Sequence, residues 1–507
     1  MKKTGFPRIQ AVLALLLLLS LVGCAFCPPQ GPWPMPPGCG SAQNTTPDPQ
    51  LPRPTDEPSE LPPPPHEVEF TVTVPYWSGT EIYIGVADDP AYIKLEPYNE
   101  AIFQGSGSFT SGEEYYYSRG TLETAEKASA RKITSDEKIY DAVLAWQDDA
   151  ARPPRADFQK GFYIGACHFC GVSFTKGNFI APIGESMDLM KAAGADYFDI
   201  MINWFIEPDY TGNTMRPIYA DEFKGDTGWV HATITDEDLL TLVEMAHQKG
   251  LKVFLNLALA PENWGPNIPG KGNIAPTDPD LFFENYTKYI THYAALGEQS
   301  GIELISIGSE NDTLTQEDIS LEHPFNRTEK WRGVIQAARE LYSGQLTYSV
   351  SCLDENRCGP ELIRFWDDLD VIGWEWYVPI ASDAHEPVAQ MKENAERIIE
   401  NHIKPLSERY QKPVILAEIG WEAYPGSCAH TYGVGPSQGG DRLEQASCYE
   451  AVFQAIEDAE YIQGVHAFIW TASLPDDNFP WIWTDSANEI RFSITEDMLT
   501  KWYHDLQ

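Results

Sequence analysis

The chain has 507 residues, of which 43% are hydrophobic and 12% aromatic, so it can bury a large core, and its length predicts more than one domain. Its 75 Asp and Glu residues against 35 Lys and Arg residues give a formal net charge of -40. Such a surface repels phosphate backbones and anionic lipid, which argues against a nucleic-acid partner, whereas a neutral polymer such as a glycan meets no such penalty.

Residues 1–23 are typical of an export signal. Lys2, Lys3 and Arg8 precede an apolar run at 11–19, which is shorter than the ~20 residues needed to span a bilayer. The run leads into Leu-Val-Gly before Cys24, a pattern that resembles a bacterial lipobox. It predicts a lipoprotein whose mature chain begins at a lipidated Cys24 and is anchored to the membrane at the cell surface. An ordinary cleaved signal with a chance cysteine is the alternative.

Residues 24–66 are crowded with proline, including four in a row at 62–65. This composition favours an extended and semi-rigid polyproline linker. The linker would hold the rest of the chain away from the lipid.

The chain has nine cysteines, eight of them besides Cys24, and an exported protein meets an oxidising environment that favours disulfides. We expect Cys352 to pair with Cys358, and Cys428 with Cys448. Cys167-His-Phe-Cys170 has the spacing of half a zinc site or of a redox pair, but no second Cys or His pair accompanies it. We therefore expect a local disulfide or buried thiols there, and no metal or cofactor.

A small all-β sandwich is predicted over residues 67–147, followed by a linker at 148–158. Apolar and polar residues alternate from Val68 to Val74, and further short strands follow at 81–86 and 114–118. The stretch from Tyr115 to Lys127 resembles a strand and turn of the starch-binding-like sandwich superfamily, with Leu122 where many relatives carry Trp. Sugar binding and a purely structural role both stay open, and Tyr76 and Trp77 could form a sugar platform or belong to the core.

From residue 159 to 507 the pattern alternates between strand and helix. Helical patterns include 236–249, 281–299, 328–341 and 388–410, and apolar strands are predicted at 161–166, 197–203, 252–258, 304–307, 346–350, 370–374, 413–417 and 464–469. Eight such units predict an α/β fold, the (β/α)8 TIM barrel. A doubly wound open sheet is the alternative, but it usually has a Gly-rich phosphate loop after its first strand, and this chain has none there.

Two of the predicted strands lead into a carboxylate. Glu310 follows the fourth strand and Glu418 follows the seventh, and the carboxyl ends of barrel strands meet at one face. Paired carboxylates can cleave a glycosidic bond, one as acid and the other, at a separation of ~5–5.5 Å, as nucleophile. One Glu at a strand end could merely cap a helix, but two at such positions favour a glycoside hydrolase.

Four sequence runs make this interpretation more specific: Ile307-Gly-Ser-Glu310, Trp331-Arg-Gly-Val-Ile335 with Leu346-Thr-Tyr348, Trp366-Asp-Asp-Leu-Asp-Val-Ile-Gly373, and Lys412-Pro-Val-Ile-Leu-Ala-Glu-Ile-Gly-Trp421. They resemble clan A of the glycoside hydrolases, and most of all glycoside hydrolase family 113, whose characterised members are mainly β-1,4-mannan hydrolases.

The resemblance implies a retaining hydrolase of β-linked polysaccharide or oligosaccharide, most of all of the β-1,4-mannan type. Glu310 would be its general acid/base and Glu418 its nucleophile. Ser309 stands where the family commonly has Thr, a change that keeps the hydroxyl. Glu375, in Gly373-Trp-Glu-Trp-Tyr377, is a less familiar acid and leaves the substrate open among mannan, other β-glycans and, if the sandwich binds starch, α-glucan.

Residues near the ends of other strands are candidates for substrate binding, because flat rings pack on sugars and polar groups bind hydroxyls. Core packing is the alternative for each aromatic residue, and binding to loop backbone is the alternative for the polar ones. The candidates are Trp470, Tyr377, Trp376, Trp204, Trp421, His168, Asn256, Ser309 and Glu375.

A second class of function is a non-catalytic glycan-binding lipoprotein that delivers sugar to a transporter. A binding protein has no need of an acid and a nucleophile, so the presence of both Glu310 and Glu418 favours the enzyme.

Overall fold

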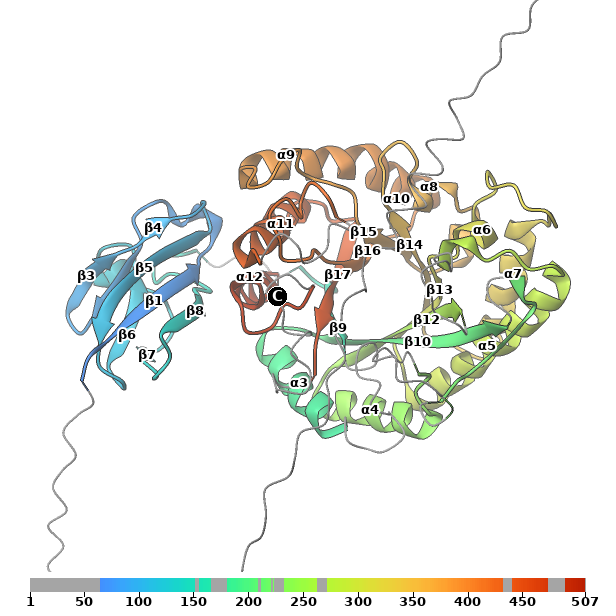
Figure 1. Cartoon of the computed structure of the whole chain (residues 1–507), viewed down its shortest axis with the longest axis horizontal. Coiled ribbons are helices and arrows are strands. Elements are labelled where there is room, and N and C mark those ends of the chain that lie inside the picture. Colours follow the sequence, from blue (N-terminus) through green and yellow to red (C-terminus); the bar gives the residue numbers. More distant parts are fainter. Residues whose placement is uncertain are drawn as a thin grey trace, which may run out of the picture.

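The computed structural model describes residues 64–150, 155–165, 180–207, 211–219, 222, 232–261, 271–431, 440–472 and 488–506. These residues form a β-sandwich and a barrel of parallel strands surrounded by helices (Figure 1). The predicted export signal with Cys24, most of the proline-rich linker, and His168 with Cys167 and Cys170 lie outside the described residues. Among the residues described, no helix combines the length and the apolar composition needed to cross a membrane.

Eight parallel strands close into the barrel, because the first of them pairs with both the second and the last. The short β11 (Thr214–Arg216) adds an antiparallel edge to the second strand. This confirms the predicted (β/α)8 fold, with a strand at each predicted place. In order around the barrel the strands are β9 (Gln159–Ile164), β10 (Tyr197–Glu207), β12 (Lys252–Pro261), β13 (Leu304–Ser309), β14 (Gln345–Cys352), β15 (Ile372–Trp376), β16 (Val414–Ile419) and β17 (Ile462–Trp470).

Helices cover the outside of the barrel. The crossover from β14 to β15 carries only the short α8 (Gly359–Leu362) and a 3₁₀ turn, η7 (Trp366–Asp368), and the crossover from β15 to β16 carries two helices joined by a π-helical turn, η8 (Ile399–Ile403). The longer helices are α3 (Ile180–Ala192), α4 (Asp236–Gln248), α5 (Pro279–Ser300), α7 (Arg327–Arg339), α9 (Val388–Ile398), α10 (Lys404–Tyr410), α11 (Arg442–Ile456) and α12 (Ile494–Asp505).

The helix ends follow from local sequence. At the starts of α4, α5 and α11, the side chains of Thr235, Asp278 and Asp441 accept hydrogen bonds from backbone N–H groups three residues on, which satisfies donors that a helix leaves unpaired. Pro279 occupies the first turn of α5, and Gly301 ends that helix with a φ of 78°, a conformation that glycine adopts without strain.

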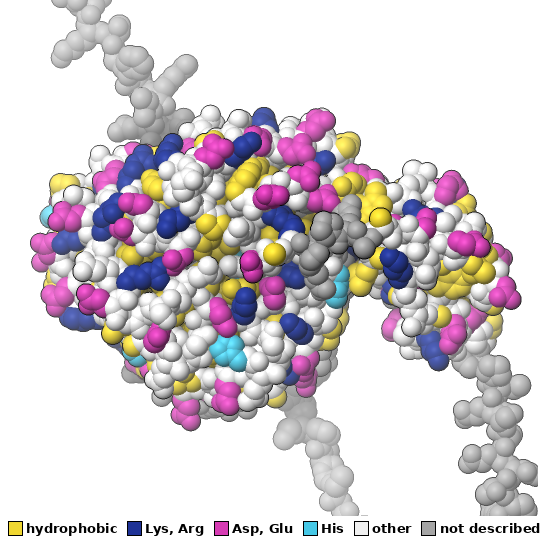
Figure 2. Space-filling model, turned by 180° about the vertical axis from the view of Figure 1, so that it is seen from behind, with side chains coloured by type: hydrophobic (Ala, Val, Ile, Leu, Met, Phe, Trp, Pro, Cys, Tyr) yellow, Lys and Arg dark blue, Asp and Glu magenta, His cyan; other side chains and the backbone are white. Residues whose placement is uncertain are grey.

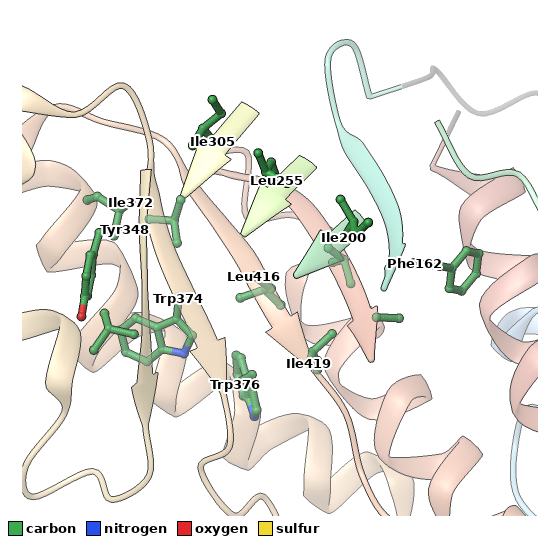
Figure 3. Packing of buried hydrophobic residues seen from close by; sticks show 14 of the residues in the cluster. Phe162, Ile200, Leu255, Ile305, Tyr348, Ile372, Trp374, Trp376, Leu416 and Ile419 are labelled. Atoms are coloured by element: carbon green, nitrogen blue, oxygen red, sulfur yellow. The ribbon is translucent and has the colours of Figure 1, made fainter. Parts of the chain in front are cut away.

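Both faces of the barrel strands are buried. Side chains on one face pack beneath the helices, and those on the other face fill the barrel interior, as alternation along a strand requires. Burial on both sides explains why the strands are nearly continuous apolar runs. The helix-side cluster includes Phe162, Ile200, Leu255, Ile305, Trp374 and Leu416 (Figure 3), and the interior cluster includes Tyr163, Met201, Phe254, Ala258, Ile415 and Ala417.

The barrel interior also holds a buried polar pair. Asp199 Oδ2 lies 2.9 Å from His466 Nδ1, and neither side chain is exposed. Burial raises the pKa of Asp199, while His466 opposes the shift. Gly161 leaves room for this pair, since a Cβ at residue 161 would lie 2.3 Å from Asp199 Oδ2 and 2.3 Å from His466 Nδ1.

The sandwich consists of two four-stranded sheets. Val68, Phe70, Tyr117 and Trp146 belong to its buried core. One sheet has the order β4 (Glu96–Pro97), β5 (Ile102–Phe109), β1 (His66–Thr73), β8 (Lys138–Ala142), and the other has the order β3 (Asp89–Lys94), β2 (Tyr83–Val86), β6 (Glu114–Ser118), β7 (Arg131–Lys132).

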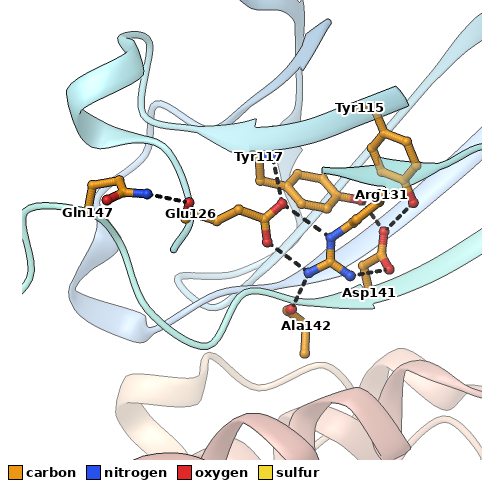
Figure 4. A network of polar contacts seen from close by, with 7 residues as sticks. All are labelled: Tyr115, Tyr117, Glu126, Arg131, Asp141, Ala142 and Gln147. Atoms are coloured by element: carbon orange, nitrogen blue, oxygen red, sulfur yellow. Dashed lines mark hydrogen bonds and ion pairs between the residues drawn. The ribbon is translucent and has the colours of Figure 1, made fainter. Parts of the chain in front are cut away.

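A charged network joins the two sheets of the sandwich (Figure 4). Arg131 lies between Glu126 and Asp141, with Nη2 2.8 Å from Glu126 Oε2 and Nη1 2.7 Å from Asp141 Oδ1. Tyr115 and Tyr117 each donate a 2.8 Å hydrogen bond to Asp141 Oδ2. The network joins β6, β7 and β8, so it fixes the strand that contributes the tyrosines.

The sandwich packs against the barrel beside α11 and α12 (Figure 1). Lys501 Nζ donates to Val74 O at 3.1 Å and lies 2.6 Å from Glu450 Oε2, with both charged side chains buried. Tyr76 stacks on Trp502 at a centroid distance of 6.2 Å and donates to Glu457. Tyr76 therefore forms part of the contact with the barrel.

The predicted disulfides Cys352–Cys358 and Cys428–Cys448 are both present, which confirms the pairing. On the face shown in Figure 2, acidic side chains are spread over both units with basic side chains among them. Surface ion pairs such as Arg332 with Asp367 and Asp368 are partly exposed and contribute little to stability.

Candidate active site

Four neighbouring strands bring hydroxyl and carboxyl groups together. Cross-strand pairs run from Ser309 to Ser349, from Ser351 to Glu375, and from Glu375 to Glu418. The residues belong to β13, β14, β15 and β16 and lie toward the carboxyl ends of these strands, the end at which barrel enzymes build their active sites.

Glu310 follows β13 in an unusual backbone conformation. Its φ is 51°, a left-handed value that non-glycine residues rarely adopt and that costs ~1–3 kcal/mol. The backbone N–H of Glu310 donates to Ser349 O at 3.0 Å, and the N–H of Asn311 donates to Tyr348 Oη at 2.8 Å. The partly exposed carboxyl group accepts a 2.7 Å hydrogen bond at Oε1 from Ser351 Oγ.

Glu418 lies on β16, and 9% of its surface is exposed. Tyr377 follows β15 and donates its phenolic hydrogen to Glu418 Oε1. A donor aimed at a carboxylate favours its ionised form. Glu418 and Glu310 therefore have different environments, one bound to a phenol and the other to an aliphatic hydroxyl.

Glu375 is completely buried on β15, between the strands of the two catalytic candidates. Ser349 Oγ lies 2.6 Å from Glu375 Oε1, Ser351 Oγ lies 2.6 Å from Oε2, and Ser309 Oγ lies 3.3 Å from Oε1. This places both Ser309 and Glu375, two predicted substrate-binding residues, in a buried hydrogen-bond network. The sequence prediction did not include Ser349 and Ser351, although their i, i+2 spacing near a strand end was a usable signal.

Asp312 is a further carboxylate that was not predicted. It begins the short helix α6 (Asp312–Thr315), and its Oδ1 accepts from Gln316 Nε2 at 2.8 Å. Burial raises the pKa of Asp312 to about 7, with a further contribution from the charge of Glu310 and an opposing one from Arg357. Its position two residues after Glu310 was the only sequence signal.

The predicted aromatic platforms lie mostly in the core. Trp376 is buried on β15 in the helix-side cluster (Figure 3), and Trp421 packs edge-on against Tyr449 at 4.9 Å. Trp204 stacks on Tyr289 at 4.7 Å, and Trp470 packs against Phe162 at 4.9 Å with the guanidinium of Arg491 over its ring. Trp376, Trp421 and Trp470 are buried, and Trp204 is partly buried.

The remaining candidates lie in different places. Tyr377 reaches the site through Glu418, and Asn256 is fully buried in the barrel, where its Nδ2 donates to Tyr163 Oη at 3.0 Å. His168 lies outside the described residues. Phe468 on β17 is partly buried against the interior cluster, with its ring 5.9 Å from that of Tyr163, so this unpredicted aromatic side chain faces the barrel interior.

In the part of the chain that the structure describes, one group of side chains has potential metal ligands. His385 Nδ1 lies 3.6 Å from Asp441 Oδ2 and 3.3 Å from Glu444 Oε2, near the sandwich residue Tyr98, whose Oη is 3.3 Å from His385 Nδ1. Asp441 also caps α11. An ion pair and a helix cap account for these contacts, and the residues differ from those around Glu310 and Glu418.

Comparisons with known proteins identify the family of the barrel. The model of Glycoside Hydrolase Family 113 matches residues 175–481, more than half of the chain. No curated protein sequence matches the chain.

Solved structures share the fold. The GH113 β-mannanase AaManA from Alicyclobacillus acidocaldarius has 22% sequence identity and a TM-score of 0.53, over 69% of this chain and 98% of that one. A second structure, of a GH113 β-1,4-mannanase in a complex, has 21% identity and a TM-score of 0.53, over 68% of this chain and 98% of that one. With the family model matching across the barrel strands that carry both carboxylates, the chain belongs to glycoside hydrolase family 113.

Proposed function

We propose that this glycoside hydrolase is a retaining enzyme that cleaves β-linked polysaccharide or oligosaccharide, most of all of the β-1,4-mannan type. The observation that carries the proposal is the pair Glu310 and Glu418, held near the carboxyl ends of β13 and β16 in different hydrogen-bond environments. The names of the solved β-1,4-mannanases with the same fold favour mannan as the substrate.

In the first step, a carboxylate oxygen of Glu418 attacks the anomeric carbon and forms a glycosyl ester. The bond from that carbon to the leaving oxygen breaks, and Glu310 gives its proton to this oxygen. The hydroxyl of Tyr377 binds Glu418 Oε1, which orients the nucleophile and stabilises it while it is charged.

In the second step, water hydrolyses the glycosyl ester. Glu310, now a carboxylate, takes a proton from the water as its oxygen attacks the anomeric carbon, and Glu418 leaves as a carboxylate. The two displacements restore the original configuration and return the proton to Glu310.

The mechanism is tested with Glu418→Ala and Glu310→Ala. Glu418→Ala should abolish the glycosyl ester, and azide should restore turnover of an activated aryl glycoside with an inverted product. Glu310→Ala should slow substrates with poor leaving groups by ~10²- to 10⁴-fold and activated ones far less, because only the former need protonation. Azide should then give a retained product.

A matched control is Glu284→Ala on α5, where the side chain is exposed and pairs only with Lys288 among its described contacts. It should keep full activity. Full activity of both site variants would defeat the assignment, and product inversion by the unmodified enzyme would exclude a retaining mechanism.

The substrate class is tested by assaying reducing ends released from mannan, β-glucans, xylan and starch. If mannan releases more reducing ends than the other polysaccharides, the result supports the proposal. A preference for starch would overturn the proposed specificity for β-linked glycans. Binding of a glycan without hydrolysis of any would favour the non-catalytic lipoprotein.

We further propose that the enzyme acts at the cell surface through a lipid on Cys24. Its support is the sequence pattern before Cys24 and the proline-rich spacer after it. Cys24→Ala should release the protein from membranes or leave it unprocessed, and an unchanged membrane fraction with an unmodified N-terminal peptide by mass spectrometry would reject the anchor.

A further inference from the structure

One hydroxyl group lies between two carboxyl groups in the active site. Ser351 Oγ is 2.7 Å from Glu310 Oε1 and 2.6 Å from Glu375 Oε2. A serine hydroxyl has a single hydrogen to donate. It can therefore donate to only one of the two, and the second contact is a hydrogen bond only if the other carboxyl group carries a proton and donates it to Ser351 Oγ.

The surroundings of Glu375 favour the proton on Glu310. Ser349 Oγ and Ser309 Oγ also lie within hydrogen-bond distance of Glu375, at 2.6 and 3.3 Å. With Ser351, three hydroxyl groups surround one carboxylate, and donors to the charged form offset the cost of burying it. Glu310 also contacts Ser351 Oγ, and its proposed role as general acid requires that it carries the proton at the start of the reaction.

We propose that Glu375 is a positioning residue that acts through Ser351 to keep a proton on Glu310. This inference rests on the proposed role of Glu310 as the general acid. Glu375 stays ionised, Ser351 donates to it, and the lone pair of Ser351 Oγ accepts the hydrogen of protonated Glu310.

The arrangement also serves the second step. After Glu310 has given its proton to the leaving oxygen, two carboxylates compete for the single hydrogen of Ser351. A carboxylate with a like charge nearby takes up a proton more readily, so Glu310 becomes a stronger base toward the attacking water. No additional proton enters or leaves over the cycle.

Other titratable groups face this site. Glu418 and Tyr377 contact each other on the β15 and β16 side, and Tyr348 meets the backbone next to Glu310. Asp312, on α6, has a pKa of about 7, which the positive charge of Arg357 lowers in part. Asp312 titrates in the range where a general acid would lose its proton, so Asp312→Asn must be measured alongside the other variants.

The test is the pH dependence of kcat/KM for Ser351→Ala, Glu375→Gln and Ser351→Thr, with a mannooligosaccharide and with an activated aryl mannoside. In Ser351→Ala and Glu375→Gln, the alkaline limb for the oligosaccharide should move by about one pH unit to lower pH, which is about a tenfold loss of rate above the limb. The activated glycoside should change much less. Ser351→Thr keeps the hydroxyl, so its alkaline limb should stay at the pH of the unmodified enzyme. In an Asp312→Asn background, the limb shift caused by Ser351→Ala should persist.

An alkaline limb that does not move in Ser351→Ala overturns the inference. An equal loss of kcat/KM at every pH with both substrates also overturns it, because such a loss would mean a purely structural role for Ser351. If Glu375→Gln fails to fold, the two Ser351 variants still decide. Should Glu310→Ala show no dependence on the leaving group, the proposed function fails as well. If that dependence is present and only the limb shift is absent, the proposed function stands and this inference alone is rejected.

Discussion

The carboxyl group of Asp312 connects pH to stability. Its pKa of about 7 in the folded protein lies above the ~3.9 of an unperturbed Asp, so the folded state binds this proton more tightly than the unfolded state does. The contribution is fully present below pH ~4 and is lost as pH rises through about 7, up to a limit of ~4 kcal/mol.

We therefore expect Asp312→Asn to change the pH dependence of stability. The variant should gain stability relative to the unmodified protein at pH 8 and gain less, or lose, at pH 5. Chemical denaturation at the two pH values measures the difference, and a parallel response of the two proteins would contradict the assigned pKa.

For single residues, the sequence predicts which side chains lie in the site more successfully than it predicts their contacts. Glu310 and Glu418 could be identified because each ends an apolar strand. The bridge from Ser351 to Glu375 depends on the register of β14 against β15, which aligns these two residues. Register follows from packing of the whole barrel, so no local pattern around Ser351 indicates it.

Strand alternation explains why one predicted sugar platform, Trp376, lies in the core. Neighbouring residues on a strand point to opposite faces. Glu375 meets the inward-facing serines, so Trp376 must point to the helices, where it packs. That part was predictable from the sequence, since Trp376 directly follows an acid expected at the site. The packing of Trp204 on Tyr289 of α5 was not, because it depends on where a distant helix lies.

A prediction at the element scale concerns Gly161 on β9. Gly161→Ala would place a Cβ 2.3 Å from both Asp199 Oδ2 and His466 Nδ1 and would force the buried pair on β10 and β17 apart. Overpacking of this kind costs ~1–3 kcal/mol, and weakening a buried pair adds to it.

The matched control is Gly333→Ala on α7, where an added Cβ meets nothing within 4 Å. In a helix interior this change should stabilise by ~0.5–1 kcal/mol. Thermal unfolding of the two variants should therefore shift in opposite directions. A Gly161→Ala protein as stable as the unmodified one would contradict the interior packing described above.

At the scale of the whole molecule, a buried charge pair of the barrel lies at the contact with the sandwich: Lys501 on α12 pairs with Glu450 on α11 and also donates to Val74 O of the sandwich. Lys501→Met would leave the Glu450 carboxylate buried without its cation, and removal of one partner of such a pair typically costs ~3–5 kcal/mol. The control is Lys404→Met, whose exposed pair with Glu400 on the barrel surface should contribute less than ~1 kcal/mol.

Adding Glu450→Leu to Lys501→Met should recover much of the loss, because it removes the unpaired charge. Denaturant unfolding of the three variants measures these differences. Equal stability of Lys501→Met and Lys404→Met would show that the buried pair between α11 and α12 does not stabilise the protein.

The sequence predicted the two units but not how they meet. Alternation from Val68 to Val74 and the eight apolar runs indicated a sandwich and a barrel. Within the predicted linker at 148–158, Arg155 donates to Ile456 O and Ala459 O at 3.0 and 2.9 Å. Only a few side chains of otherwise amphipathic helices make this contact, so the hydrophobic pattern of a single segment does not predict it.

The partners in this contact are 427 residues apart along the chain, Val74 near the beginning and Lys501 near the end. At ~5–20 residues per second, a ribosome needs about 20–85 s to make the chain between them. The sandwich can form soon after its own residues emerge, but its docking partner α12 follows all eight barrel strands along the chain. Throughout that interval, the side of the nascent sandwich that carries Tyr76 faces water or a chaperone instead of Trp502.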